Sequence, residues 1–289
     1  MTHTEQPPIQ AVVLDLDGTL LNSKHELSPR NEAAVKAVIA KGIHVILATG
    51  KTRNSGKGLI EKLGIRSPGI YLQGLAVYDA EGKIIYQQTL DPALTRQVLT
   101  FMDDRGFFTI AYSGERILTR IHSQEAIDAT IRYHEPAPEV IGALQNVVGE
   151  LPLHKVMAIG DPRAILALRW QLGFQVGTQG RLMQAGVPTM LEVLPPGGGK
   201  GSALRWLLKE LRISPERVMA VGDAENDVEM IKLAGIGVAM AQAAQNVRDA
   251  ADHVVGSNDE DGVAEALERF VLAPQPEQPT PAISEVKPS

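Results

Sequence analysis

Residues 11–20 of the chain read Ala11-Val12-Val13-Leu14-Asp15-Leu16-Asp17-Gly18-Thr19-Leu20. The apolar, β-branched start of this segment predicts a buried parallel strand, with Asp15 and Asp17 at its carboxyl end. Open α/β sheets bind their ligands at that edge. Two carboxylates so close together repel each other unless a cation lies between them. Different surroundings can then make one a nucleophile and the other a proton carrier, although an isolated pair is more often an ordinary strand exit.

A second polar cluster follows the apolar segment 43–47 and consists of Thr49, Gly50 and Lys51. A hydroxyl and free backbone N–H groups between a strand and a helix are suited to holding phosphate oxygens. The same pattern on its own is typical of a simple turn. Its place after another apolar strand makes it a candidate for the same sheet edge as Asp15.

A third cluster, Gly197-Gly198-Gly199-Lys200-Gly201-Ser202, opens an amphipathic stretch. It resembles a P-loop but lacks two of its required residues, because Leu194 stands where the first glycine should be and Gly201 where the Ser or Thr should be. We therefore expect Lys200 at the start of a helix, as a fixed cation for an anionic group. The alternative is a solvated surface lysine after a flexible loop.

The fourth cluster, Gly222-Asp223-Ala224-Glu225-Asn226-Asp227, follows the apolar run 218–221. Its carboxylates and amide are hard oxygen ligands suited to Mg²⁺. Enrichment of acids at a helix N-terminus would explain Glu225 but not the concentration of acids at a strand end. A magnesium ion, a lysine and a threonine at one edge would together neutralise a phosphoryl group during its transfer.

These four clusters, in this order, resemble the four motifs of the haloacid dehalogenase superfamily. The later stretches Ala234-Gly235-Ile236-Gly237-Val238-Ala239-Met240 and Asn258-Asp259-Glu260-Asp261-Gly262-Val263 are similar to its Cof-type sugar-phosphatase branch. The resemblance covers nearly the whole chain apart from the two tails. It implies a doubly wound, Rossmann-like parallel-sheet core of the α/β class with an inserted α/β cap domain.

The resemblance also implies a role for each motif residue. Asp15 would attack phosphorus and form an aspartyl-phosphate, while Asp17 would protonate the leaving alcohol and then deprotonate the hydrolytic water. The phosphate would be bound by Thr49, Gly50, Lys200 and Asn226. The Mg²⁺ ion would be bound by the Asp15 side chain, the Asp17 backbone carbonyl and Asp223. Asp227 and Lys51 would support these groups.

The chain departs from the usual pattern at three places. Lys51 stands where family members usually carry Arg, and a lysine cannot make the planar bidentate contact of a guanidinium. Gln73-Gly74 replaces the usual Asn-Gly after the third strand, and Ala241-Gln242-Ala243 replaces the usual Gly-Asn-Ala. We expect the core chemistry to survive these changes, whereas they weaken the substrate preference that the branch implies.

The spacing of the motifs predicts where a second domain is inserted. The 31 residues between Asp17 and Thr49 leave room only for a loop, a helix that Ser28 caps and Pro29 begins, and a strand. After the third strand, residues 76–78 and 83–86 read as a hairpin with a turn at 79–82. We expect core segments at 1–81 and 191–273, with 191–194 as a core strand. The α/β cap would occupy 82–190, with connections near Gly82 and Pro188, and 274–289 would be a disordered, Pro-rich tail.

Composition restricts the function further. The chain has 289 residues, 44% hydrophobic content, no cysteine and a formal net charge of −6. We see neither an apolar run of about 18 residues nor a secretory signal, and the acidic balance argues against nucleic acid as a partner. The seven histidines show no metal-ligand spacing, so we expect structural roles for them. We expect a cytoplasmic monomer or weak homodimer that does not bind membranes.

The resulting hypothesis is a Mg²⁺-dependent phosphatase that hydrolyses small phosphomonoesters. Sugar phosphates are the leading substrates, and flavin mononucleotide, ribitylaminouracil phosphate and pyridoxal phosphate are alternatives. A dehalogenase would have no use for Asp17 as an acid, and a sugar-phosphate mutase of this superfamily would typically carry its cap between Asp17 and Thr49. A silent phosphate-binding protein would be expected to have lost Asp15, Asp17 or Lys200.

Overall fold

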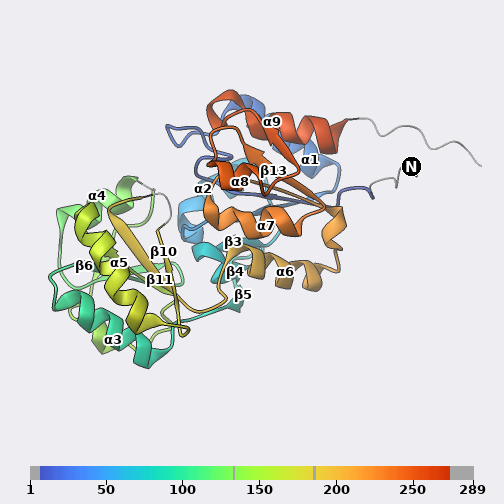
Figure 1. Ribbon diagram of the computed structural model, residues 1–289. Coiled ribbons are helices and arrows are strands. Elements are labelled where there is room, and N and C mark those ends of the chain that lie inside the picture. Colours follow the sequence, from blue (N-terminus) through green and yellow to red (C-terminus); the bar gives the residue numbers. More distant parts are fainter. Residues whose placement is uncertain (1–6, 133, 185–186, 274–289) are drawn as a thin grey trace, which may run out of the picture.

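The computed structural model describes residues 7–132, 134–184 and 187–273. These residues form two domains, and the chain passes from the first domain to the second and back again (Figure 1). The N-terminal part of the first domain contains β1 (Ala11–Leu14), α1 (Pro29–Ala40), β2 (His44–Leu47), α2 (Arg53–Leu63), β3 (Gly69–Tyr71), β4 (Ala76–Tyr78) and β5 (Ile84–Gln87). Its C-terminal part contains α6 (Lys200–Leu211), β12 (Val218–Gly222), α7 (Val228–Leu233), β13 (Ile236–Met240), α8 (Gln245–Arg248), β14 (His253–Val255) and α9 (Gly262–Leu267).

The first domain is built on a parallel sheet with the strand order β14-β13-β12-β1-β2. A parallel bridge between Ala48 and Ile70 places β3 next to β2. Ala11 of β1 pairs with Val218 on one side and His44 on the other, so the two halves of the domain meet at β1. The sheet order therefore changes direction between β1 and β12, which is where doubly wound sheets bind ligands.

The side chains of β1 alternate between two apolar layers, as the period of a strand requires. Val12 and Leu14 pack in the layer formed with α1 and α9, whereas Ala11 and Val13 pack in the layer formed with α6 and α7. Helices therefore cover both faces of the sheet, and the predicted doubly wound core is confirmed (Figure 1). Helix α1 starts as the sequence predicts, because the Ser28 side chain accepts a hydrogen bond from the Asn31 N–H and Pro29 is the first helical residue.

The second domain contains α3 (Pro92–Asp103), β6 (Phe108–Ser113), β7 (Arg116–Thr119), α4 (Gln124–Arg132), β8 (Glu139–Val140), β9 (Lys155–Ile159), α5 (Pro162–Val176), β10 (Arg181–Met183) and β11 (Met190–Leu194). Its sheet has the order β10-β11-β9-β6-β7-β8 and is antiparallel except for β7 and β8. Helices α3 and α5 pack on one face. On the other face Tyr112 and Met157 pack with Tyr71 and Leu75 of the first domain.

The expectation that residues 191–194 resume the core sheet is wrong. Leu191 pairs with Ala158 of β9, and Val193 pairs with Leu182 of β10, both antiparallel, so β11 belongs to the second domain. The other boundary also moves, because β5 completes the predicted hairpin with β4 and thus stays with the first domain. The crossings therefore follow Gln87 and Leu194 rather than lying at Gly82 and Pro188. The predicted disordered tail at 274–289 lies outside the described residues.

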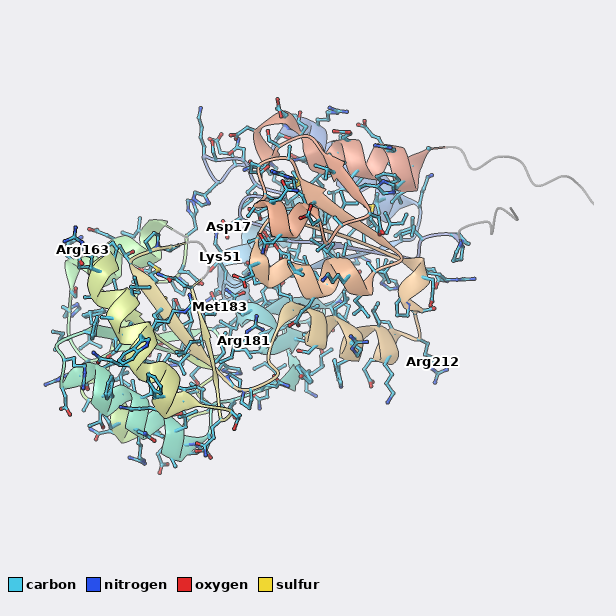
Figure 2. All side chains as sticks on the ribbon, in the orientation of Figure 1. Asp17, Lys51, Arg163, Arg181, Met183 and Arg212 are labelled. Carbon is cyan, nitrogen blue, oxygen red and sulfur yellow. The ribbon has the colours of Figure 1, made fainter. Side chains whose placement is uncertain are left out.

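The two domains meet at the carboxyl edge of the parallel sheet. Figure 2 shows Asp17 and Lys51 of the first domain facing the second domain, with Met183 on the opposite side of the junction. Arg181 of β10 contributes to the junction, since its Nη1 donates to the Gly198 carbonyl at 3.3 Å. Within the described part of the chain, we find no helix both long enough and apolar enough to cross a membrane.

His154 of the second domain gives the fold a dependence on pH. The ring is fully buried, its Nδ1 accepts the Gly114 N–H at 3.1 Å, and burial lowers its pKa from 6.5 to about 4. Because the unfolded chain binds a proton at pH values where folded His154 stays neutral, stability should fall as the pH drops from 6.5 to 4, by roughly 3 kcal/mol. Urea unfolding at several pH values should show that the free energy of unfolding falls less between pH 6.5 and 4 in His154→Gln than in the wild type. An equal fall in both proteins would contradict this assignment.

Candidate active site

The sequence-predicted residues come together at the carboxyl edge of the core sheet. Asp15 follows β1, Thr49 follows β2, and Asp223 follows β12, and these three strands are neighbours in the sheet. Lys200 is the first residue of α6, as expected for a cation at a helix start. The four motifs, which lie up to about 200 residues apart in the sequence, thus form one site because parallel strands end at the same edge.

Lys200 is the buried centre of this site. Its side chain is 1% exposed, and its Nζ contacts Asp15 Oδ1 at 2.5 Å and Asp227 Oδ1 at 2.7 Å. Burial alone would lower the pKa of Lys200, but the two carboxylates outweigh this effect and raise it. Lys200 is therefore a permanent cation, and the solvated surface lysine considered above is excluded.

Asp227 organises the loop that carries Asp223. Its Oδ1 binds Lys200, and its Oδ2 accepts the backbone N–H groups of Asp223 at 3.1 Å and Ala224 at 3.0 Å. Gly222 permits this close approach, since a Cβ at that position would lie 2.4 Å from the Asp227 Cβ. Both oxygens of Asp227 are thus engaged within the protein, which makes it a positioning group for Lys200 and Asp223.

Carboxylate oxygens of Asp15, Asp223 and Asp227 lie within 4.8 Å of one another. Burial, followed by the charge of Asp227, raises the pKa of Asp223 to about 6, and burial also raises the pKa of Asp15. Thr19 Oγ1 orients Asp223 by donating to its Oδ1 at 3.0 Å. Buried, mutually repelling carboxylates with oriented oxygens fit a hard divalent cation such as Mg²⁺. With Asp227 occupied, Asp15 and Asp223 are the side chains best placed to bind it.

Asp17 has surroundings different from those of Asp15. Its carboxylate is 28% exposed, and its Oδ1 lies 2.7 Å from Lys51 Nζ and 3.0 Å from His25 Nδ1. Asp15 is instead nearly buried and bound to Lys200. The two carboxylates, which are separated by a single residue, thus differ in partner and exposure, and such a difference suits a nucleophile and a proton carrier.

His25 is a site residue that the sequence analysis missed. We assigned structural roles to all histidines because none showed metal-ligand spacing, yet the His25 ring contacts Asp17. His25 lies in the left-handed region with φ of 59°, in a loop whose course the sequence does not determine. No motif marks the residue, and its contact with Asp17 becomes visible only when the loop is placed.

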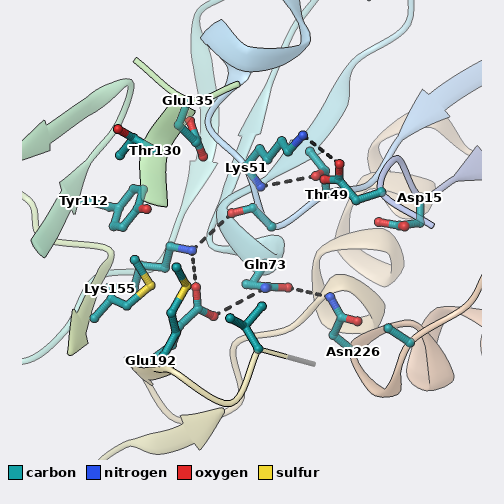
Figure 3. Close-up of a pocket in the computed structure, with 16 residues that line it drawn as sticks. Asp15, Thr49, Lys51, Gln73, Tyr112, Thr130, Glu135, Lys155, Glu192 and Asn226 are labelled. Carbon is teal, nitrogen blue, oxygen red and sulfur yellow. Dashed lines mark hydrogen bonds and ion pairs between the residues drawn. The ribbon is translucent and has the colours of Figure 1, made fainter. Parts of the chain in front are cut away.

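A cavity extends from the carboxyl edge of the core sheet into the second domain (Figure 3). Asp15, Asp17, Thr49 and Lys51 line its core side. The second domain supplies a set of residues that sequence reasoning did not identify: Tyr112, Thr130, Glu135, Lys155, Met157, Val187, Met190 and Glu192. These come from strands, loops and helix α4 without a shared motif, so only the folded structure brings them together.

Polar contacts cross the cavity from one domain to the other (Figure 3). Asn226 Nδ2 donates to Gln73 Oε1 at 2.8 Å, and Gln73 Nε2 donates to Glu192 Oε2 at 3.4 Å. Lys155 Nζ then binds Glu192 Oε1 at 2.5 Å and the Gly50 carbonyl at 3.2 Å. Gln73, where the resemblance leads us to expect Asn, thereby links Asn226 of the loop after β12 to the second domain.

Comparison with known proteins agrees with this architecture. A family model for haloacid dehalogenase-like hydrolases matches residues 12–267. The chain is 29% identical over 273 residues to the Bacillus subtilis 5-amino-6-(5-phospho-D-ribitylamino)uracil phosphatase YcsE, covering 93% of this chain and 98% of that protein. A solved haloacid dehalogenase-like hydrolase from Bacteroides thetaiotaomicron superposes with a TM-score of 0.83 at 29% identity, covering 90% of this chain and 99% of that one.

A longer plant protein is also similar. The chain is 34% identical over 277 residues to the chloroplastic endoribonuclease YBEY of Arabidopsis thaliana, covering 92% of this chain but only 47% of that protein. The chain thus spans about half the length of this relative. The match of the family model over most of the sequence decides the classification. The resemblance of the four motifs is confirmed, and the chain belongs to the family of haloacid dehalogenase-like hydrolases.

Proposed function

We propose that the protein is a Mg²⁺-dependent phosphatase that hydrolyses small phosphomonoesters through an aspartyl-phosphate. The observation that carries this proposal is that the two carboxylates have different surroundings. Asp15 is fixed by Lys200 beside Asp223, whereas Asp17 is held separately by Lys51 and His25. Both carboxylates line the same cavity. A phosphoryl group in that cavity meets a nucleophile on one side and a proton carrier on the other.

The proposed reaction has two steps. In the first, an oxygen of Asp15 forms a bond to phosphorus while the ester bond to the leaving alcohol breaks, and Asp17 gives that alcohol its proton. In the second, Asp17 takes a proton from water, whose oxygen attacks phosphorus and releases Asp15 and inorganic phosphate. Lys200 holds Asp15 in position and neutralises charge on the phosphoryl oxygens.

Further groups at the site support the transfer. Mg²⁺, bound by the carboxylates of Asp15 and Asp223 and the backbone carbonyl of Asp17, would supply charge neutralisation at the phosphoryl oxygens. Thr49 and Gly50, which line the cavity, offer a hydroxyl and a backbone N–H to the same oxygens. Asn226 completes the set from the loop after β12, and Asp227 keeps that loop and Lys200 in place.

We further propose that the second domain is the cap that selects the leaving group. Sugar phosphates remain the leading substrates, and the polar groups of Lys155 and Glu192 suit their hydroxyls. The alternative, a phosphorylated cofactor or cofactor precursor, is favoured by Tyr112, Met157 and Met190, which give the cavity apolar walls suited to a planar ring. The similarity to YcsE supports the same alternative.

Substitution of the two carboxylates tests the mechanism. Asp15→Asn should abolish phosphate release, because an amide cannot form the phosphoenzyme. Asp17→Asn should lower the rate by roughly 10²–10⁴-fold, the scale of general acid–base catalysis. Phosphate release from p-nitrophenyl phosphate would be measured, with circular dichroism to verify folding. Turnover by Asp15→Asn above a trace would rule out Asp15 as the nucleophile.

Removal of metal tests the cation site. We expect EDTA to silence the enzyme and Mg²⁺ to restore it, because the acidic cluster requires a counter-charge beyond Lys200. Mg²⁺ should also raise the melting temperature of the wild type by mass action, and this rise should be much smaller in Asp223→Ala. Glu210→Ala, which alters an exposed acid of α6 away from the cluster, is the control. Full activity of the metal-free enzyme would refute the proposal.

A panel of phosphate esters distinguishes the two substrate classes. Hexose and pentose phosphates would be compared with flavin mononucleotide, pyridoxal phosphate and the ribitylaminouracil phosphate. If the apolar wall selects a planar ring, kcat/KM should be highest for the heterocyclic esters, and Tyr112→Ala should lower it for these esters more than for the sugar phosphates. If kcat/KM is highest for a sugar phosphate and Tyr112→Ala has no selective effect, the result would favour sugar phosphates as the substrates.

A further inference from the structure

Glu135 of the second domain caps a helix of the first. Its Oε1 accepts the backbone N–H of Thr52 at 3.0 Å, and its Oε2 accepts the hydroxyls of Thr52 and Ser55, both at 2.5 Å. Thr52 is the N-cap residue of α2, and its own side chain makes no capping hydrogen bond. A carboxylate at a helix N-terminus satisfies free N–H groups and interacts favourably with the helix dipole. The cap that α2 lacks locally is therefore supplied by the other domain.

The residue before Thr52 connects this contact to the catalytic site. Lys51 donates from Nζ to Asp17 Oδ1 at 2.7 Å and is itself nearly buried. Any displacement of Thr52 moves the backbone of Lys51, and with it one of the two groups that hold the Asp17 carboxylate. Figure 3 shows Glu135 on the side of the cavity from which Lys51 extends.

The second partner of Asp17 is in contact with the same segment of the second domain. The His25 ring, whose Nδ1 lies 3.0 Å from Asp17, packs edge-on against the ring of His134 with centroids 5.5 Å apart. His134 directly precedes Glu135. Two consecutive residues of the second domain thus contact the surroundings of Asp17. His134 contacts His25, and Glu135 contacts Thr52, the neighbour of Lys51.

Building on the proposed function, we propose that Glu135 is a positioning residue that couples closure of the second domain to the placement of Asp17. With Glu135 bound at the start of α2, Thr52 and Lys51 are fixed and Asp17 is held where it can protonate a leaving group. When the domains separate, this contact is lost and Asp17 loses its fixed placement. Efficient protonation then occurs only in the closed enzyme, where the leaving group is shielded from water.

The kinetic test compares two leaving groups. An alkyl phosphate needs a proton from Asp17, whereas the nitrophenolate of p-nitrophenyl phosphate leaves without one. Glu135→Gln should lower the single-turnover rate of leaving-group release roughly 10- to 100-fold for the alkyl ester, the scale expected for a misplaced catalytic group, and much less for the aryl ester. The double variant Thr52→Val with Ser55→Ala should show the same selectivity. In an Asp17→Asn background, Glu135→Gln should have no further effect.

The control is Glu139→Gln. Glu139 is an exposed carboxylate of the same domain, and it pairs with Arg116 of that domain rather than with the first domain. The substitution removes the same charge without touching Thr52, so the rates for both esters should match those of the wild type. Equal losses on both esters in Glu135→Gln, or losses that add to those of Asp17→Asn, would overturn the positioning role and leave only a structural contact.

A distance measurement tests the closure without any turnover. The chain has no cysteine, so cysteines at the exposed positions Ala37 of α1 and Ala167 of α5 can carry spin labels on the two domains. Glu135→Gln should broaden and lengthen the interdomain distance distribution, and Glu139→Gln should leave it unchanged. An unchanged distribution in Glu135→Gln would overturn the inference. If the wild type hydrolyses no ester, the proposed function fails, and this measurement still decides whether Glu135 holds the domains closed.

Discussion

The buried contact of Lys200 with Asp15 and Asp227 is the interaction on which the site depends. Three carboxylates, those of Asp15, Asp223 and Asp227, share a small volume with this one ammonium group. They leave a formal excess of two negative charges in surroundings where unpaired charge is costly. A divalent cation balances that excess. The same electrostatic constraint therefore holds Asp15 in place, orders the loop after β12 and supports the proposed magnesium site.

The sheet determines where this cluster can lie, and the second domain determines what can reach it. β1, β2 and β12 are parallel neighbours, so their carboxyl ends place Asp15, Thr49 and Asp223 at one edge. The antiparallel sheet of the second domain faces that edge with Tyr112 and Met157 on its inner side. The cavity between them is thus lined by charged groups on the side of the core sheet and by both polar and apolar side chains on the side of the second domain. Such a division fits the proposed role of the second domain in selecting the leaving group.

The sequence was sufficient for the parts of the structure that depend on local pattern. The strand ending at Leu14, the helix beginning at Pro29 and the hairpin of β4 and β5 were predicted correctly, because caps, turns and apolar periods act over a few residues. The placement of Asp15, Thr49 and Asp223 followed from the rule that parallel strands share an edge. The resemblance to a known family supplied the implied roles of these residues.

Apart from the domain boundary placed at Gly82, inside the β4–β5 hairpin, the failures concern contacts between distant segments. Residues 191–194 read equally well as a strand of either sheet, and the pairing of Glu192 with Lys155 in the second domain cannot be read from an apolar run. His25 and Glu135 likewise carry no motif. Their contacts depend on loops that bring them to Asp17 and Thr52, and such loops are set by tertiary packing rather than by local propensity.

The most direct test of the central claim is mass spectrometry of acid-quenched enzyme during turnover. Asp17→Asn mixed with p-nitrophenyl phosphate and Mg²⁺ should accumulate the phosphoenzyme, because the activated leaving group departs without a proton while the hydrolytic water is no longer deprotonated. Peptide mapping should then find one phosphoryl group, on Asp15. Release of nitrophenol without a labelled peptide, or a label on any other residue, would contradict the account.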